Sequence, residues 1–499
     1  MKYVIGVDLG TSAVKILLVD QKGNVAKNIS KSYPLIHEKN GYSEQDPKHW
    51  VDQTAAGLKE LLSAFGGNVE DIEGISFSGQ MHGLVLLDSD NKVLRPAILW
   101  NDTRTTAECQ QIYDVVGHRR LLEITKNPAL EGFTLPKILW VQKNEPKLFK
   151  KVKSFVLPKD YLRYKITGNL EMEFSDAAGT LLLDVNHKQW SQEICKLLEL
   201  DVNMCPPLVS SHDEVGTVTK EFAEASGLAQ STRVFAGGAD NACGAIGAGI
   251  LEEGKTLCSI GTSGVVLSYE ARGDKDFNGK VHYFNHAAPG AYYTMGVTLA
   301  AGYSLSWFKD AFAPDASFAE LLADIHNVPA GSNGLVFTPY LVGERTPHAD
   351  AAIRGSFIGM DGSHRRKDFV RAVLEGITFS LNELIAIFRE SGKTIDTIVS
   401  IGGGAQNGDW LQMQADIFNA KIIRLTSEQG PGMGAAMLAA FGCSWFQTLQ
   451  ECADEFLQED KSYSPIEENV QIYRKLFPIY QEIYENTKDL NIKLLEFRK

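Results

Sequence analysis

The chain has 499 residues, of which 44% are hydrophobic and 22% charged, and it carries a formal net charge of −13 at pH 7. This length exceeds that of one compact core and predicts two or more domains, while the composition is that of a folded globular protein without disordered tracts. The acidic balance excludes the basic surface expected of a nucleic-acid-binding protein.

The sequence shows no signal peptide, no membrane-spanning segment and no cysteine pattern typical of disulfides or a metal site. No run of eighteen apolar residues occurs, and the N-terminal MKYVIGVDLG lacks the basic-then-apolar order of a signal peptide. We therefore expect a cytoplasmic protein that binds neither membrane nor nucleic acid. The seven cysteines are scattered and form no C-x-x-C pair, so neither a disulfide framework nor a zinc site is predicted.

The first segment predicts a strand that ends in a tight turn. An apolar run over residues 3–8 stops at Gly10-Thr11-Ser12, and a second apolar run follows over residues 13–20. Gly10 permits close approach of the backbone, the hydroxyls of Thr11 and Ser12 are suited to phosphate oxygens, and Asp8 is suited to orient Mg²⁺ through water. The pattern fits a phosphate-binding turn, but a plain β-turn explains it equally well.

A second strand is predicted over residues 74–78, and the motif Gln80-Met81-His82-Gly83 follows it. Because these side chains lie in a turn, we expect them at the edge of a cleft rather than in a core. Met81 and His82 are suited to contact a small polyol, although simple surface packing accounts for a lone Met-His pair. Helices are predicted around residues 50–65 and 369–388 from their apolar spacing.

Further along the chain, Gly237-Gly238-Ala239-Asp240-Asn241 precedes a run of small residues over positions 242–249. The small residues predict a closely packed helix, and Asp240 is a preferred type of N-cap. The sharper interpretation is a carboxylate held beside a cleft, where it accepts a proton from a sugar hydroxyl. Both interpretations can hold at once.

Two more glycine-rich turns follow predicted strands in the second half of the chain. Gly261-Thr262-Ser263 comes after residues 256–260 and repeats the first GTS turn, which suggests an internal duplication. Gly403, Gly404, Ala405 and Asn407 lie in a turn between the strand at residues 397–401 and a helix, an order that suits nucleotide binding. The glycines of residues 244–254 predict a boundary between domains 1–246 and 247–499.

The motifs taken together resemble the carbohydrate kinases related to glycerol kinase and gluconokinase, within the actin, hexokinase and Hsp70 superfamily. Within that family, the similarity is to the members that phosphorylate D-xylulose. The order of five motifs carries the resemblance along nearly the whole chain: Ser78-Gly79-Gln80-Met81-His82-Gly83, Trp100-Asn101-Asp102, Leu157-Pro158-Lys159-Asp160-Tyr161, Ser175-Asp176-Ala177-Ala178-Gly179-Thr180 and Gly343-Glu344-Arg345-Thr346-Pro347-His348.

The resemblance implies an α/β fold of two RNase H-like (actin-like ATPase) domains facing across a central cleft, the first on the sugar side and the second on the nucleotide side. It implies that Asp240 is the catalytic base and that Asp8 supports activity through Mg²⁺ and the phosphates. Met81, His82 and Asn241 would bind the sugar. ATP would contact Gly10, Thr11, Ser12, Gly261, Thr262, Gly403, Gly404, Ala405 and Asn407. A homodimer is also expected.

Other functions remain open at this point. Within the kinases, ribulose, fuculose or gluconate are alternative substrates. From another class, an actin- or Hsp70-like ATPase switch would use the same GTS turns, and a sugar-responsive repressor would share the kinase-like fold but needs a basic DNA-binding arm. The role of the Gly343–His348 loop is also open, since a salt-bridged structural turn would explain its residues.

Overall fold

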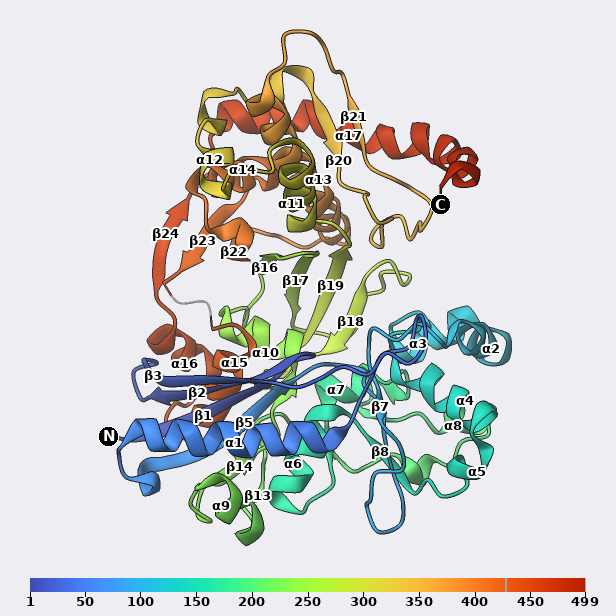
Figure 1. Cartoon of the computed structure of the whole chain (residues 1–499), viewed down its shortest axis with the longest axis vertical. Helices are drawn as coiled ribbons and strands as arrows, with labels where there is room; N and C mark the ends of the chain where they lie inside the picture. The colour runs from blue at the N-terminus through green and yellow to red at the C-terminus, as the bar shows by residue number, and fades with distance from the viewer. Residues whose placement is uncertain (427–428, 499) are drawn as a thin grey trace. The chain divides into compact units, whose positions relative to one another are not determined.

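A computed structural model describes residues 1–426 and 429–498 of the chain, and these residues divide into two compact units. Unit 1 comprises Met1–Leu251, Glu270–Tyr293 and Gln429–Gln458, and unit 2 comprises Glu252–Tyr269, Thr294–Glu428 and Glu459–Lys499. Each unit is a mixed α/β structure (Figure 1). Among the helices of the described residues, none combines the length and the apolar character needed to cross a membrane.

The main sheet of unit 1 has the strand order β13-β14-β5-β1-β2-β3, with β15 paired to β5. Its strands are β1 (Tyr3–Leu9), β2 (Ala13–Asp20), β3 (Val25–Ser32), β5 (Ile72–Gly79), β13 (Glu214–Thr217), β14 (Arg233–Phe235) and β15 (Gly238–Ala239). β1 and β2 form an antiparallel hairpin, and β5 lies parallel to β1 in the register Asp8↔Ser78. This confirms the strand-turn-strand predicted at the N-terminus and the strand predicted over residues 74–78.

Helices cover both faces of this sheet. α1 (Pro47–Phe65) lies along β2 and β3 on one face, and α10 (Asp240–Gly247) and α15 (Pro431–Gly442) lie on the other (Figure 1). The remaining α-helices described in unit 1 are α2 (Thr106–Val116), α3 (His118–Thr125), α4 (Thr134–Asn144), α5 (Pro146–Phe149), α6 (Pro158–Thr167), α7 (Phe174–Ala178), α8 (Gln192–Leu197), α9 (Lys220–Ser226) and α16 (Leu449–Phe456). Short strands complete it: β4 (Glu44–Gln45), β6 (Val85–Leu87), β7 (Ala97–Ile98), β8 (Ser154–Val156), β9 (Met172–Glu173), β10 (Leu183–Asp184), β11 (Gln189–Trp190), β12 (Leu208–Val209) and β18 (His282–Asn285).

Small residues bring α10 and α15 into close contact. The run of small residues over positions 242–249 predicted such a closely packed helix. A Cβ atom on Gly434 would lie 1.9 Å from the carbonyl oxygen of Cys243, and one on Gly247 would lie 2.3 Å from the carbonyl oxygen of Gly430. Glycine is therefore required where the two helices touch. The contact fixes the axis of α10, whose first residue is Asp240.

Unit 2 repeats the topology of unit 1. Its sheet includes the strand order β19-β17-β16-β22-β23-β24, in which β16 and β17 form an antiparallel hairpin and β22 lies parallel to β16. The strands are β16 (Lys255–Ile260), β17 (Gly264–Glu270), β19 (Tyr292–Thr298), β22 (Thr397–Gly402), β23 (Lys421–Leu425) and β24 (Glu459–Tyr463), with a separate pair β20 (Val336–Thr338) and β21 (Ser356–Ile358). A GTS turn thus closes the first hairpin of each sheet, as the suggested duplication requires.

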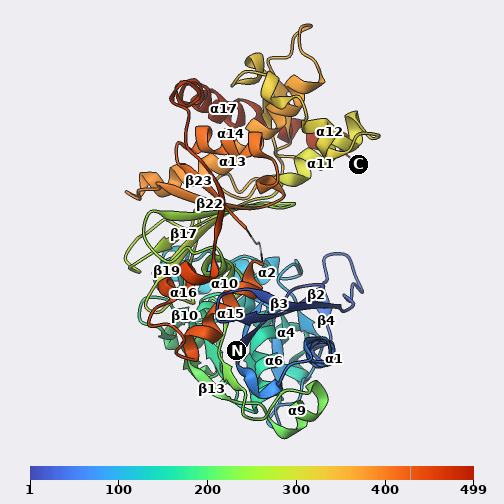
Figure 2. The ribbon, with the colours of Figure 1, turned by 90° about the vertical axis from the view of Figure 1, so that its left-hand side faces the viewer.

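The α-helices described in unit 2 are α11 (Gly302–Phe312), α12 (Phe318–Leu322), α13 (Arg366–Glu390), α14 (Gly408–Phe418) and α17 (Glu467–Lys493). Figure 2 shows α13, α14 and α17 gathered over one face of β22 and β23. The long helix predicted around residues 369–388 is α13, and the helix predicted after the Gly403 turn is α14. Both helix predictions for this half are confirmed, and so is the strand that precedes the Gly403 turn.

Candidate active site

The loop after β5 places Met81 and His82 at the end of the central strands of unit 1. Met81 is buried, and His82 adopts a left-handed backbone conformation with φ of 66°. Nδ1 of His82 lies 2.7 Å from the carbonyl oxygen of Gly179, and the ring packs on Phe133 with centroids 4.6 Å apart. The His82 ring is therefore held in one orientation by contacts from two other segments.

A buried lysine that no sequence motif indicated also holds this loop. Lys137 of α4 is fully buried, and its Nζ donates hydrogen bonds to the carbonyl oxygens of Phe133 at 2.8 Å and of His82 at 3.5 Å. Burial lowers the pKa of Lys137 to about 7. Thr134 Oγ1 donates to the same His82 carbonyl at 3.1 Å. No local sequence pattern connects Lys137 with His82, because the two meet only in the folded unit.

Asp240 is the first residue of α10, directly after β15. The helix cap is Ala239, which makes no side-chain capping bond, so the interpretation of Asp240 as the N-cap is wrong by one position. Instead, Oδ1 of Asp240 accepts hydrogen bonds from the backbone N–H of Asn241 at 2.7 Å and from its side-chain amide at 3.0 Å. A negative charge at this end of the helix is stabilised by the helix dipole.

One of the two predicted catalytic carboxylates changes the pKa of the other. Asp8 is the second-last residue of β1 and lies opposite Ser78 of β5. Burial raises the pKa of Asp8, an effect that the Ser78 hydroxyl and Lys15 partly offset. Burial, and after it the charge of Asp8, raise the pKa of Asp240 to about 7. A carboxyl group with this pKa is suited to exchange a proton near neutral pH.

Asn241 joins this acid to the loop after β5. Its amide nitrogen lies 3.5 Å from Sδ of Met81, and the hydroxyl of Tyr293 lies 3.9 Å from the same sulfur. The structure therefore brings together Met81, Asp240 and Asn241, which were singled out from two separate motifs. Tyr293 was not predicted, because it lies in a segment without a recognisable motif.

The first GTS turn closes the hairpin of β1 and β2. The N–H of Gly10 donates to the carbonyl oxygen of Ala13 at 3.0 Å, and Thr11 Oγ1 accepts a hydrogen bond from Trp100 Nε1 at 2.9 Å. Ser12 is exposed. The turn geometry is thus supported by internal bonds, and the Thr11 hydroxyl already has a partner within unit 1.

A cavity of about 610 Å³ lies within unit 2 and is lined by five of the residues predicted to bind nucleotide: Gly261, Thr262, Gly403, Gly404 and Asn407. Ala405, the sixth predicted residue of this unit, is buried and is not among the lining residues. The side chain of Asn407 caps α14 by accepting the N–H of Trp410 at 2.9 Å. Apolar side chains that sequence reasoning missed, including Tyr303, Phe318 and Leu322, complete the wall.

Side chains of the Gly343–His348 loop make contacts with other segments of unit 2. Glu344 Oε1 accepts the N–H groups of Leu299 at 2.9 Å and of Arg345 at 2.8 Å. The His348 ring stacks on Tyr484 with centroids 3.6 Å apart, and its Nε2 lies 3.6 Å from Glu383 Oε1. These contacts favour the structural interpretation of the loop that the sequence left open.

Comparison with known proteins agrees with this architecture. The chain matches the model for the N-terminal domain of the FGGY family of carbohydrate kinases over residues 3–247 and the model for its C-terminal domain over residues 256–443. It is 62% identical to xylulose kinase of Bacillus subtilis (strain 168) over 499 residues, which covers 100% of both chains.

Solved structures give the same result. Ligand-bound xylulose kinase from Lactobacillus acidophilus has a TM-score of 0.92 at 29% identity, covering 98% of this chain and 99% of the other. Gluconate kinase from Lactobacillus acidophilus has a TM-score of 0.92 at 30% identity, covering 97% and 98%. The chain therefore belongs to the FGGY family of carbohydrate kinases and is an ATP-dependent sugar kinase.

Proposed function

We propose that this kinase transfers the γ-phosphoryl group of ATP to the 5-hydroxyl of D-xylulose and that Asp240 is the general base. The observation that carries the proposal is the carboxylate of Asp240 at the start of α10, with a pKa raised to about 7 and with Asn241 and Met81 beside it. Support for the substrate comes from similarity to xylulose kinases, among them the 62%-identical enzyme of Bacillus subtilis.

On the sugar side, Met81, His82 and Asn241 would bind the substrate. Met81 offers an apolar, polarisable surface to the carbon chain, and the amide of Asn241 offers hydrogen bonds to hydroxyl groups. Contacts from Phe133, Gly179 and Lys137 hold the His82 loop before the sugar arrives. A preorganised site binds with a smaller loss of entropy.

The proton would move from the 5-hydroxyl of D-xylulose to the carboxylate of Asp240. Because Oδ1 already accepts two N–H groups of Asn241, we assign the proton to Oδ2. The sugar oxygen then forms a bond to the γ-phosphorus while the bond from that phosphorus to the β,γ-bridging oxygen breaks. The products are D-xylulose 5-phosphate and ADP.

ATP would bind in the cavity of unit 2. Phe318, Leu322 and Tyr303 offer apolar surface to a purine ring, whereas the turns at Gly261–Thr262 and Gly403–Gly404 let phosphates approach the backbone closely. The turn Gly10-Thr11-Ser12 of unit 1 is the further phosphate contact that we propose.

Mg²⁺ is the metal that we propose for this reaction. Among residues 1–426 and 429–498, the His, Cys, Asp and Glu side chains form no group of three or more arranged to hold a metal ion. The carboxylates of Asp8 and Asp240 interact electrostatically, and oxygen ligands of this kind suit a hard cation. Asp8 would contact Mg²⁺ through water, and the bound ion would neutralise phosphate charge.

An ADP-release assay over a panel of acceptors tests the substrate. We expect kcat/KM to be highest for D-xylulose, with D-ribulose, L-fuculose and gluconate at least about tenfold lower. Phosphorus NMR of the product should identify a 5-phosphate. The likeness to gluconate kinase makes gluconate the second candidate, and a higher kcat/KM for gluconate would overturn the xylulose assignment.

The cytoplasmic location of the protein and its assembly into a homodimer stay predictions.

A further inference from the structure

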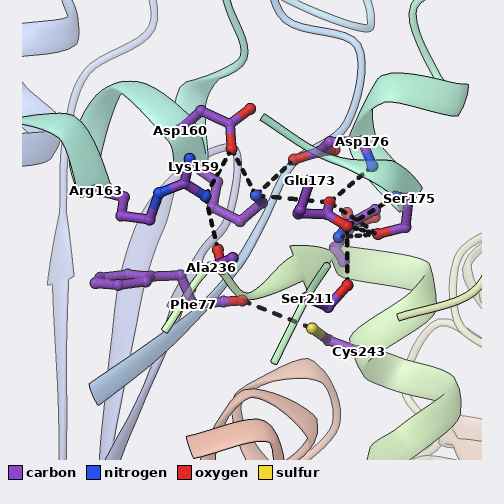
Figure 3. Close-up of polar contacts among 12 residues, drawn as sticks. Phe77, Lys159, Asp160, Arg163, Glu173, Ser175, Asp176, Ser211, Ala236 and Cys243 are labelled. Atoms are coloured by element: carbon purple, nitrogen blue, oxygen red, sulfur yellow. Dashed lines mark hydrogen bonds and ion pairs between the residues drawn. The ribbon is translucent and has the colours of Figure 1, made fainter. Parts of the chain in front are cut away.

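A buried ionic cluster lies beside the segment that leads to Asp240. It consists of five charged side chains, each of them 0% exposed: Lys159, Asp160, Arg163, Glu173 and Asp176. Lys159 Nζ lies 2.7 Å from Asp160 Oδ1, 3.3 Å from Asp176 Oδ2 and 3.6 Å from Glu173 Oε1 (Figure 3).

The electrostatics of this cluster favour one fixed arrangement. Burial alone would lower the pKa of Lys159, but the carboxylates of Asp160, Asp176 and Glu173 raise it above the ordinary value. Removing a partner from such a buried group leaves an uncompensated charge, which is strongly destabilising. The cluster is therefore a rigid anchor for any group hydrogen-bonded to it.

Ser175 connects the cluster with the backbone next to Asp240. The carboxylate of Glu173 accepts hydrogen bonds from the Ser175 N–H at 2.7 Å and from Ser175 Oγ at 2.8 Å. The same Oγ atom accepts the N–H of Ala239 at 2.9 Å, 64 residues further along the chain. Because the hydroxyl donates to a buried carboxylate, its own position is strongly determined.

The segment 236–239 is held at both ends and has little room to move. Arg163 Nη1 donates to the carbonyl oxygen of Ala236 at 2.9 Å, at the end opposite to Ala239. Between them, Gly237 has φ of 79°, and a Cβ atom on Gly238 would lie 2.8 Å from Cβ of Ala287. A shift of this segment would move the start of α10, and with it Asp240.

We propose that Ser175 is a positioning residue for Asp240, which it holds through the N–H of Ala239 from an anchor formed by the buried ionic cluster. This proposal rests on the role of Asp240 as the base in the proposed function. Ser175 touches neither substrate in this scheme. Its effect is on the placement of the carboxylate, and misplacement of a reacting group by about 1 Å costs on the order of 100-fold in rate.

The test compares Ser175→Ala with Ser211→Ala. Ser211 Oγ also donates to Glu173 Oε2, at 2.9 Å, but it has no bond to Ala239, so it is a matched control for the loss of one hydroxyl at the same carboxylate. We expect Ser175→Ala to lower kcat about 10- to 100-fold while the KM values for D-xylulose and ATP change by less than about threefold. Ser211→Ala should retain kcat within about twofold, while its loss of Tm should be similar to that of Ser175→Ala. Equal kcat in both variants would overturn the proposal.

A double variant of Ser175 and Asp240 distinguishes a positioning role of Ser175 from a general structural effect. If Ser175 acts through Asp240, adding Ser175→Ala to Asp240→Ala should leave the residual rate unchanged. Additive losses would overturn the role of Ser175 while leaving Asp240 as the base. Near-normal turnover of Asp240→Ala alone would instead overturn the proposed function, and the Ser175 proposal with it.

If Ser175→Ala does not fold, Ser175→Cys takes its place, because the thiol fills the same space but is a weaker hydrogen-bond acceptor. Full kcat in Ser175→Cys would also overturn the proposal.

Discussion

The amide nitrogen of Asn241 lies 3.5 Å from the sulfur of Met81, which joins the start of α10 to the loop after β5. The pair brings the proposed base and the proposed sugar-binding loop into one site within unit 1. Because Asn241 also donates two hydrogen bonds to Asp240, a sugar bound on Met81 would lie next to the carboxylate.

Asp240→Ala should lower kcat by about 10²- to 10⁴-fold, the usual contribution of a positioned general base. The substitution removes the carboxylate but leaves the nucleotide cavity of unit 2 untouched. Calorimetry should therefore still show binding of ATP with Mg²⁺, and the exposed Asp315→Asn is a control with normal turnover. Loss of ATP binding in Asp240→Ala would contradict the assignment of Asp240 to proton transfer alone.

His82→Ala should raise the KM for D-xylulose by about tenfold and change the KM for ATP little, because a contact to the sugar stabilises ground state and transition state alike. Steady-state kinetics with each substrate varied in turn measures both constants. A large rise in the KM for ATP with an unchanged sugar KM would show that the loop after β5 does not bind the sugar.

The raised pKa of Asp240 predicts an acidic limb in the pH profile of kcat/KM. A base acts when deprotonated, so the rate should be level above pH 7 and fall about tenfold per pH unit below it. The charge of Asp8 contributes to the raised value, and Asp8→Asn should therefore move the limb to lower pH, whatever its effect on the maximum rate. A limb that stays in place, or moves to higher pH, would show that Asp8 does not control Asp240.

Gly302→Ala should raise the KM for ATP by about tenfold and leave the KM for D-xylulose unchanged, because the substitution weakens ground-state binding of ATP alone. A Cβ atom on Gly302 would lie 2.5 Å from the carbonyl oxygen of Gly261, and the turn that lines the cavity would have to shift. Gly362→Ala is the matched control in the same unit, because its Cβ would meet nothing within 4 Å. Unchanged ATP kinetics in Gly302→Ala would argue against this cavity as the nucleotide site.

Much of the fold was predictable because its signals are local. The two GTS turns, the strands around them and the long helix α13 follow from apolar periodicity and from glycine at turns, which neighbouring residues determine. The close packing of α10 was also predictable, since only small side chains allow helices to approach so closely. Met81 and Asp240 were selected as candidate site residues from the chemistry of their local motifs, and Asn241 was selected from the family resemblance.

The tertiary structure decided what connects these motifs. The bond from Ala239 to Ser175 spans 64 residues, that from Lys137 to His82 spans 55, and neither leaves a periodic pattern in the sequence. The segment Gln429–Gln458 belongs to unit 1 although it follows most of unit 2, and Asp240 begins α10 rather than capping it. Such contacts depend on the path of the whole backbone, because buried polar groups find partners wherever the fold brings them within hydrogen-bonding distance. The sequence alone thus selected the residues that we propose to carry the chemistry, and the folded chain determined how each of them is held.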